Sequence, residues 1–336
     1  MKVTFLFGAG ASRHTLPIIS EIPEQLKSFI DEMKNPALIL DEGKFKDLNT
    51  KDNKLEIQNL LITDLEWLLD LSSRHASVDT AAKKLFIKGN YGGLTRLKVA
   101  LSIFFVFEQL KKKPDYRYDA FFASLLQDGI RSFPDNVRII SWNYDYQFEL
   151  SYQEYSGDKR ISSSQAMLNV VTKFDYSKRT SDSFKICKLN GTTGLFKDRG
   201  FHQYTYVDDF DRELDKELME SFVRNYAVAV YFSNQFYPSL SFAWERQNSE
   251  TDIVSFAAKE VLDTETLVVI GYSFPFFNRE IDRSIIGTMA NLKSVYFQAP
   301  DAENIIDRFQ SIRPDIEKLK IKPIHDVFQF FLPPEL

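Results

Sequence analysis

Residues 3–12 read VTFLFGAGAS, a run of β-branched and aromatic residues that ends in a Gly-Ala-Gly turn and a serine. The run predicts a buried strand, and a turn of small residues at its end lets the backbone approach a phosphate. We expect the amide groups of a following helix to point at the same phosphate. The third glycine of the G-x-G-x-x-G fingerprint is missing, because His14 to Pro17 follow instead. A tight strand–helix turn without a ligand therefore stays open as an alternative.

The composition is that of an ordinary globular protein. The chain has 336 residues, of which 44% are hydrophobic and 26% charged, so it can bury a large core in one domain or two. The net charge of -5 argues against nucleic acid as the main partner. Thirty Phe and 15 Tyr predict an interior rich in aromatic rings.

The single cysteine, Cys187, excludes an internal disulfide and a multi-cysteine zinc site. It stands in an apolar, strand-like run, which indicates a buried thiol. The N-terminus has no pattern of a signal peptide, and the apolar runs are too short to span a bilayer. We expect a cytoplasmic protein with no membrane partner.

Apolar strands alternate with helical patterns over most of the chain, which predicts an α/β fold with a Rossmann-like, doubly wound, mostly parallel sheet. We expect a single domain over 1–336, with helical insertions at about 20–130 and 208–260. The predicted helices are 21–33, 55–75, 94–110, 119–128, 277–290 and 301–311. The predicted strands after the first are 136–143, 184–191, 266–274, 294–300 and 326–332.

Small, amide and hydroxyl side chains follow each of these strands. In an open α/β sheet, ligands bind at the carboxyl ends of the strands, and such groups hydrogen-bond ribose and phosphate oxygens. No lysine–serine phosphate clamp and no Ser-His-Asp arrangement follows a strand. The residues that stand at these ends are Asn143 and Asp145, Asn190, Gly271 and Ser273, and Gln298.

The motifs GAGAS, WNYD, KLNG and GYSF, in this order, resemble those of the SIR2-like (sirtuin-related) family. The likeness is to its bacterial branch, many of whose members consume NAD in antiphage defence. The resemblance implies NAD as substrate or ligand and an NAD hydrolase that releases nicotinamide. Activity in this family often depends on assembly, so a homo-oligomer is one expectation. We expect the aromatic-rich stretch at 226–244 to pack within the second insertion, with a lid or an oligomer face as the alternative.

The resemblance assigns roles to the residues at the strand ends. It implies that Asn143 positions an attacking water and that Asp145 holds the nicotinamide ribose. Asn190 would hydrogen-bond a ribose hydroxyl. The pyrophosphate would lie on Gly8, Ala9, Gly10, Ala11 and Ser12, the adenosine half on Gly271 and Ser273, and the adenine ribose near Gln298.

Two departures from the family pattern leave alternatives open. One cysteine cannot build the four-cysteine zinc module of the deacetylating sirtuins, so we expect no zinc and no protein deacetylation. The family's general base is a histidine where this chain has Asn190, and an asparagine does not titrate. A sensor that binds NAD or ADP-ribose without cleaving it is therefore the second hypothesis, and an interaction protein without a ligand the third. His14 and His202 are candidates for a substitute base.

Asn143 and Asp145 have a second interpretation, because asparagine and aspartate commonly cap the helix that follows them. Ser273 has the same alternative. These alternatives predict side-chain bonds to the first backbone amides of the next helix, which a structure can test.

Overall fold

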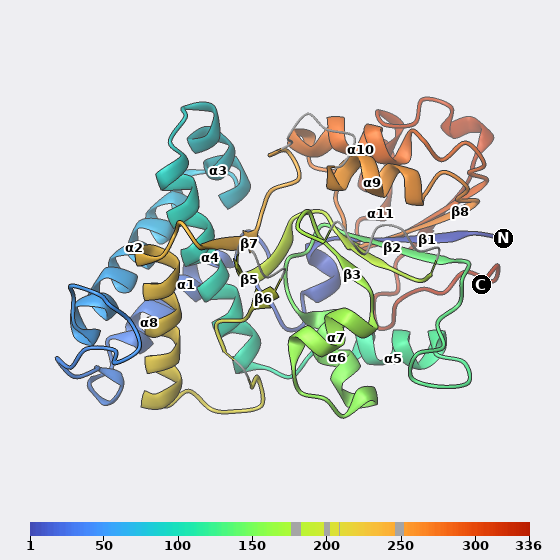
Figure 1. The fold of residues 1–336 in the computed structure, drawn as a ribbon. Helices are drawn as coiled ribbons and strands as arrows, with labels where there is room; N and C mark the ends of the chain where they lie inside the picture. Colours follow the sequence, from blue (N-terminus) through green and yellow to red (C-terminus); the bar gives the residue numbers. More distant parts are fainter. Residues whose placement is uncertain (176–182, 198–201, 208, 246–251) are drawn as a thin grey trace. The chain divides into compact units, whose positions relative to one another are not determined.

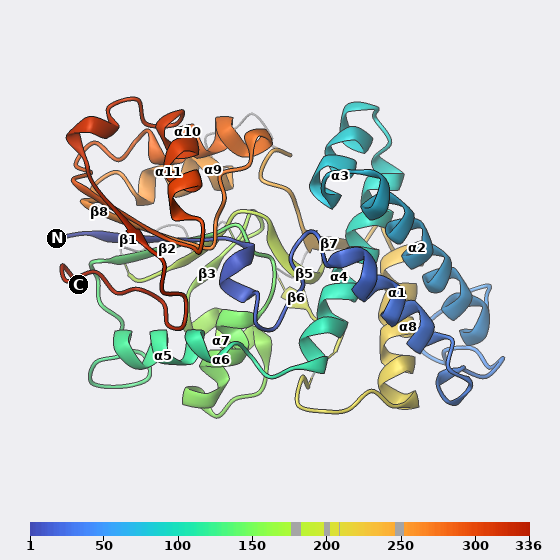
Figure 2. The same ribbon diagram turned by 180° about the vertical axis from the view of Figure 1, so that it is seen from behind.

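The computed structural model describes residues 1–175, 183–197, 202–207, 209–245 and 252–336 (Figures 1 and 2). The chain divides into two compact units. Unit 1 is Met1–His14, Pro114–Gly191 and Ser241–Leu336, and unit 2 is Thr15–Lys113 and Thr192–Leu240. The ranges predicted as insertions, about 20–130 and 208–260, cover much of unit 2 and also extend into unit 1.

Unit 1 is built on a seven-stranded sheet with the order β10-β9-β8-β1-β2-β4-β3. Every strand pairing in this sheet is parallel, and the chain first forms β2, β3 and β4 on one side of β1 and then β8, β9 and β10 on the other. The predicted Rossmann-like, doubly wound α/β fold is confirmed. The strands are β1 (Val3–Phe7), β2 (Val137–Ser141), β3 (Val170–Val171), β4 (Ile186–Lys188), β8 (Thr266–Ile270), β9 (Ser294–Gln298) and β10 (Lys320–Ile324).

Helices cover both faces of this sheet (Figure 1). On one face Leu6 and Ile140 pack in a core with side chains of α9, α10 and α11. On the other face Phe5 and Phe7 pack in a core with side chains of α5 and α6. Alternate residues of one strand thus serve two cores, which explains why these strands are apolar throughout. The helices of unit 1 are α5 (Tyr116–Leu125), α6 (Gln147–Ser156), α7 (Ile161–Met167), α9 (Ile253–Glu260), α10 (Arg279–Ile286) and α11 (Ala302–Gln310).

The central strands end at the same level of the sheet. The parallel register pairs Phe7 with both Ser141 and Ile270. It also pairs Ser141 with Lys188, and Ile270 with Gln298. The segments that follow β1, β2, β4, β8 and β9 therefore start along one edge, which we call the carboxyl edge.

Unit 2 combines a bundle of helices with a small sheet of order β6-β5-β7. Phe29 and Phe107 stack with ring centroids 3.8 Å apart and join α1 to α4. The region 208–260, predicted as mostly helical, supplies a strand to this sheet as well. The elements are α1 (Ile22–Met33), α2 (Lys54–Arg74), α3 (Val78–Ile87), α4 (Tyr91–Lys111), α8 (Lys216–Tyr231), β5 (Gly191–Lys197), β6 (His202–Tyr204) and β7 (Phe236–Leu240).

The prediction of a strand at 326–332 was wrong. The last strand is β10 at Lys320–Ile324, an edge strand that is largely exposed and contains Pro323. Phe330, after this strand, is buried in the core and packs edge-to-face on Phe7 and Tyr118, whereas Phe328 is exposed. Burial of a loop under the sheet thus produced the apolar run that resembled a strand.

Cys187 lies in β4 and is buried, as predicted. Within the described residues, no helix combines the length and the apolar character needed to cross a membrane.

Candidate functional site at the carboxyl edge

The glycine turn leads into a single 3-10 turn, Ala9–Ser12, rather than an α-helix. The next α-helix, α1, begins only at Ile22 and belongs to unit 2. The expectation that a helix directly follows the turn was therefore wrong. The physical reason lies in Pro17, because a proline has no amide hydrogen to donate and breaks a helix that would start at Ala9.

The glycines of the turn are required by close backbone packing between the ends of β1 and β8. A Cβ on Gly8 would lie 2.6 Å from the Tyr272 Cα, and one on Gly10 would lie 2.9 Å from the Gly271 Cα. Gly271 itself has φ +61°, and its Cβ would lie 2.3 Å from the Ala11 nitrogen. The amides of Gly8, Gly10 and Ala11 all donate to backbone carbonyls. The glycine pattern is thus explained by the junction of two strands, and three turn amides are already engaged.

Three predicted residues meet directly beside this turn. The Ser12 hydroxyl donates to Asp145 Oδ2 at 2.9 Å, and Asn143 Nδ2 lies 3.3 Å from the Ser12 oxygen. Asn143 Nδ2 also donates to the Gly8 carbonyl at 3.0 Å. The ends of β1 and β2 are therefore joined by a hydroxyl, an amide and a carboxylate, a group that we call the Ser12 cluster.

Tyr118 from α5 completes the Ser12 cluster. Its hydroxyl lies 2.9 Å from the Ser12 oxygen. Because the Ser12 hydrogen goes to Asp145, the Tyr118 hydroxyl is the donor in this contact. Nothing in the sequence indicated this bond, because it depends on how α5 packs against the glycine turn.

Burial controls the electrostatics of the cluster. It raises the pKa of the Asp145 carboxyl, while the nearby Lys188 ammonium acts in the opposite direction. Lys188 Nζ is fully buried, donates to both Glu149 carboxylate oxygens at 2.7 Å, and donates to the Asp145 carbonyl at 2.6 Å. The lysine of KLNG thus fixes the loop that carries Asn143 and Asp145.

Asn143 and Asp145 differ with respect to capping. Asp145 Oδ1 accepts from the amide of Gln147, the first residue of α6, so this side chain satisfies one free amide at the start of the helix, although the N-cap position itself is Tyr146. Asn143 makes no such bond. Among the described residues, its Oδ1 has no hydrogen-bond partner and is left to accept from a ligand or water.

Backbone groups engage both ends of the Asn190 side-chain amide. Its Nδ2 donates to the Trp142 carbonyl at 2.9 Å, and its Oδ1 accepts from the Ala243 amide at 3.0 Å. The side chain joins the end of β2 to the segment that begins at Ser241. Asn190 thus lies at the same edge as the Ser12 cluster, and its bonds connect two backbone segments of that edge.

Gln298 and Ser273 have different surroundings from those of the cluster. Gln298 Nε2 donates to the carbonyls of Asp326 and Gln329, and its Oε1 accepts from the Phe331 amide. The side chain thus holds the C-terminal segment over the end of β9. Ser273 is exposed and caps no helix, because the following 3-10 helix begins after Pro275 and α10 after Asn278.

Arg117, at the start of α5, donates to the backbone of the glycine turn, a contact that was not predicted from the sequence. Arg117 Nη2 donates to the Ala11 carbonyl at 2.7 Å and to Asp115 Oδ2 at 2.6 Å. Both side chains are buried. The only sequence signal was the charged DYRYD run at a helix start, which is also typical of a solvated helix end.

Trp142 and Tyr272, from the WNYD and GYSF motifs, stack with ring centroids 5.4 Å apart. The Tyr272 hydroxyl donates to the Asp282 carboxyl of α10 at 3.0 Å. Burial raises the pKa of Asp282 to about 8. These contacts join the two motifs through packing and a buried acid.

The side chain of His202 lies outside the described residues, so its predicted role is not addressed. Across the described part of the chain, no group of three or more His, Cys, Asp or Glu is arranged to hold a metal ion.

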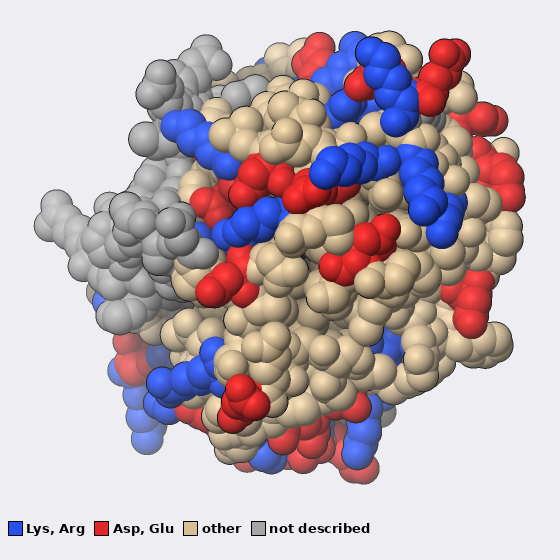
Figure 3. Space-filling view, turned by 90° about the vertical axis from the view of Figure 1, so that its right-hand side faces the viewer, with Lys and Arg blue, Asp and Glu red and all other residues tan. Residues whose placement is uncertain are grey.

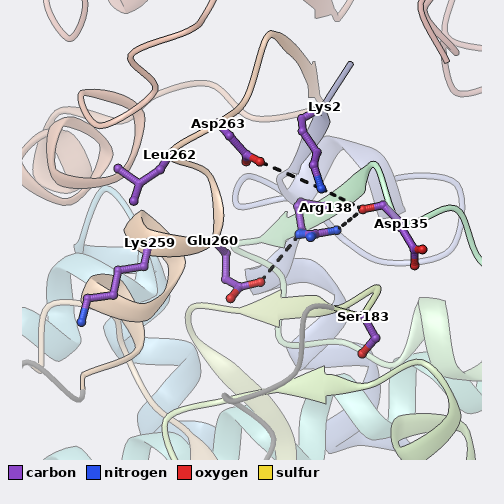
Figure 4. Close-up of a pocket in the computed structure, with 8 residues that line it drawn as sticks. All are labelled: Lys2, Asp135, Arg138, Ser183, Lys259, Glu260, Leu262 and Asp263. Atoms are coloured by element: carbon purple, nitrogen blue, oxygen red, sulfur yellow. Dashed lines mark hydrogen bonds and ion pairs between the residues drawn. The ribbon is translucent and has the colours of Figure 1, made fainter.

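A cavity of about 590 Å³ lies at the opposite end of the sheet (Figure 4). Four of its charged side chains form two pairs: Lys2 lies 4.0 Å from Asp263, and Arg138 lies 3.7 Å from Glu260. On the face of the molecule in Figure 3, acidic and basic side chains are interspersed. The remaining lining residues are Asp135, Ser183, Lys259 and Leu262.

The fold and the carboxyl-edge residues define a doubly wound α/β protein with a polar cluster where β1 and β2 end. No protein-family model matches the sequence, and no curated protein matches it.

Proposed function

We propose that this chain is a SIR2-like protein that binds NAD at the carboxyl edge and hydrolyses it, releasing nicotinamide. The observation that carries the proposal is the Ser12 cluster, in which the first two motifs of the family resemblance meet within 3.3 Å. Hydroxyl, amide and carboxylate groups at this edge suit the hydroxyl-rich riboses of a dinucleotide.

In the proposed reaction, the nicotinamide–ribose bond breaks through an oxocarbenium-like state. Asn143 Oδ1 accepts a hydrogen bond from the attacking water and orients it toward the anomeric carbon. Asp145 holds the nicotinamide ribose and stabilises the positive charge that develops on it. Lys188 and Ser12 position these two residues by the contacts described above.

The pyrophosphate is proposed to lie along the outer side of Ala9, which is exposed, beside Gly10. Gly271 and the exposed Ser273 are proposed to contact the adenosine half. Gln298 contributes by holding the C-terminal segment near the adenine ribose. By the same resemblance, we propose a cytoplasmic role in antiphage defence.

Binding without cleavage is the second candidate function, and Asn190 favours it. This side chain does not titrate, and both ends of its amide are engaged by backbone groups. A chain with this residue can form the wall of an NAD site without supplying the family's general base.

One experiment separates the two functions. Purified protein is incubated with NAD over a range of protein concentrations, and nicotinamide release and the NAD-dependent rise in Tm are measured together. We expect both signals for the natural chain. We expect both to be reduced in Asn143→Ala and retained in Asn136→Ala, which removes a half-buried asparagine just before the start of β2.

A rise in Tm without nicotinamide release would identify the chain as a sensor. Neither signal in the natural chain would contradict both functions. Equal losses in the two variants would show that the effect is not specific to the carboxyl edge.

A further inference from the structure

His14 follows the glycine turn and faces a buried acid. Its Nδ1 lies 3.7 Å from Asp115 Oδ2, and the Asp115 side chain is 0% exposed while that of His14 is 40% exposed. The imidazole also stacks on Tyr116, with ring centroids 5.7 Å apart. With Nδ1 toward the carboxylate, Nε2 is the ring nitrogen left for another partner.

The acid that faces His14 is held firmly. Asp115 accepts from Arg117 Nε and Nη2 and from the Arg117 amide. Its own amide donates to Gln147 Oε1 at 2.8 Å. An imidazole beside a fixed carboxylate keeps one orientation, which is the arrangement that a general base requires.

The pair is connected to the Ser12 cluster from two directions. Gln147 contacts Asp115 through its side chain and Asp145 through its backbone amide. In addition, Ser12 lies only two residues before His14. The other described histidines lack this relation: His75 bonds the carbonyl of Leu71 in unit 2, and His325 forms an exposed pair with Glu303.

We propose that His14, oriented by Asp115, is the proton acceptor of the carboxyl-edge site and supplies the base that Asn190 lacks. This inference rests on the proposed NAD hydrolysis. The water oxygen bonds to the anomeric carbon of the nicotinamide ribose, and one water proton passes to His14 Nε2. The carbon–nitrogen bond breaks, and its electron pair leaves with neutral nicotinamide. ADP-ribose remains, and His14 later releases its proton to solvent.

The test compares His14→Ala with His325→Ala, a matched loss of a histidine paired with a carboxylate on the surface of the same unit. For His14→Ala we expect nicotinamide release to fall by about 100-fold or more, the usual range for loss of a general base. The NAD-dependent rise in Tm should persist, and imidazole added to the buffer should restore part of the cleavage. His325→Ala should cleave like the natural chain.

The outcomes separate this inference from the proposed function. Unchanged cleavage in His14→Ala overturns the assignment of the base alone. So does a loss of cleavage that imidazole does not restore. If the natural chain binds NAD but never cleaves it, the assignment of His14 as the base is overturned, while NAD binding at the carboxyl edge is retained. A natural chain that does not bind NAD overturns both.

Discussion

At the scale of single residues, Gly271 carries the strongest steric constraint at the carboxyl edge. Its φ is +61°, and an added Cβ would lie 2.4 Å from the Gly10 carbonyl carbon. Both the conformation and the space therefore require glycine. The sequence marked this residue as a ligand contact, whereas its packing alone explains the glycine.

Gly271→Ala is therefore expected to lower the free energy of unfolding by more than about 4 kcal/mol, because backbone atoms must move. Gly157→Ala is the matched control, since Gly157 has φ +68° with no atom within 4 Å of the added Cβ. Strain in the left-handed region alone should cost about 1–2 kcal/mol there. Urea unfolding measures both. Equal losses would refute the packing argument.

Asp282 predicts a pH dependence of stability. Burial raises its pKa to about 8, above the ordinary value of 3.8. The folded state thus binds more protons between these values, and its stability falls as the pH rises from about 4 to about 8. Between pH 6 and 8 the loss should approach roughly 2–3 kcal/mol. Asp282→Asn should remove this part of the slope, as measured by urea unfolding at several pH values. An unchanged slope would contradict the burial argument.

At the scale of elements, strand β4 and helix α6 are joined by the Lys188–Glu149 pair, in which both side chains are 0% exposed. Lys188→Met should destabilise the fold by about 3–5 kcal/mol, because it leaves a buried carboxylate unpaired. The double variant with Glu149→Leu should be less destabilised than the sum of the two single variants.

Unfolding of the three variants in urea gives the coupling energy of this pair. Lys293→Met serves as the control, since its partner Glu265 is accessible to solvent and the pair should contribute little. Additive effects of the Lys188 and Glu149 substitutions would show that the pair does not act as a unit.

The elements also show what a sequence can predict. Strands β1, β2, β4, β8 and β9 were predicted because buried parallel strands read as continuous apolar runs. Strand β10 was missed because an exposed edge strand, Lys320–Ile324, carries lysines and a proline. At the site, the placement of Ser12, Asn143 and Asp145 at the carboxyl edge could be predicted, since each follows a predicted strand. Contacts across elements, such as Arg117 with Ala11, depend on tertiary packing, and the charged DYRYD run around Arg117 did not identify its partner.

At the scale of the whole molecule, the chain forms two compact units, each with its own sheet. The glycine turn, the Ser12 cluster and the His14–Asp115 pair all belong to unit 1. The chain leaves unit 1 twice to form unit 2 and returns each time to the seven-stranded sheet. The site in unit 1 is therefore assembled from three separate stretches of chain. Composition and periodicity predict the elements of such a unit better than its boundaries.

We propose above that a nucleotide of the NAD class occupies the carboxyl edge. The most direct test is a crystal structure of the protein with ADP-ribose, which contains both riboses and is not consumed. We predict the ligand beside Ser12, Asn143 and Gly271, with a ribose hydroxyl or an ordered water on Asn143 Oδ1. ADP-ribose bound in the opposite cavity beside Lys2 and Arg138, or an empty carboxyl edge at saturating ligand, would show that this edge is not an NAD site.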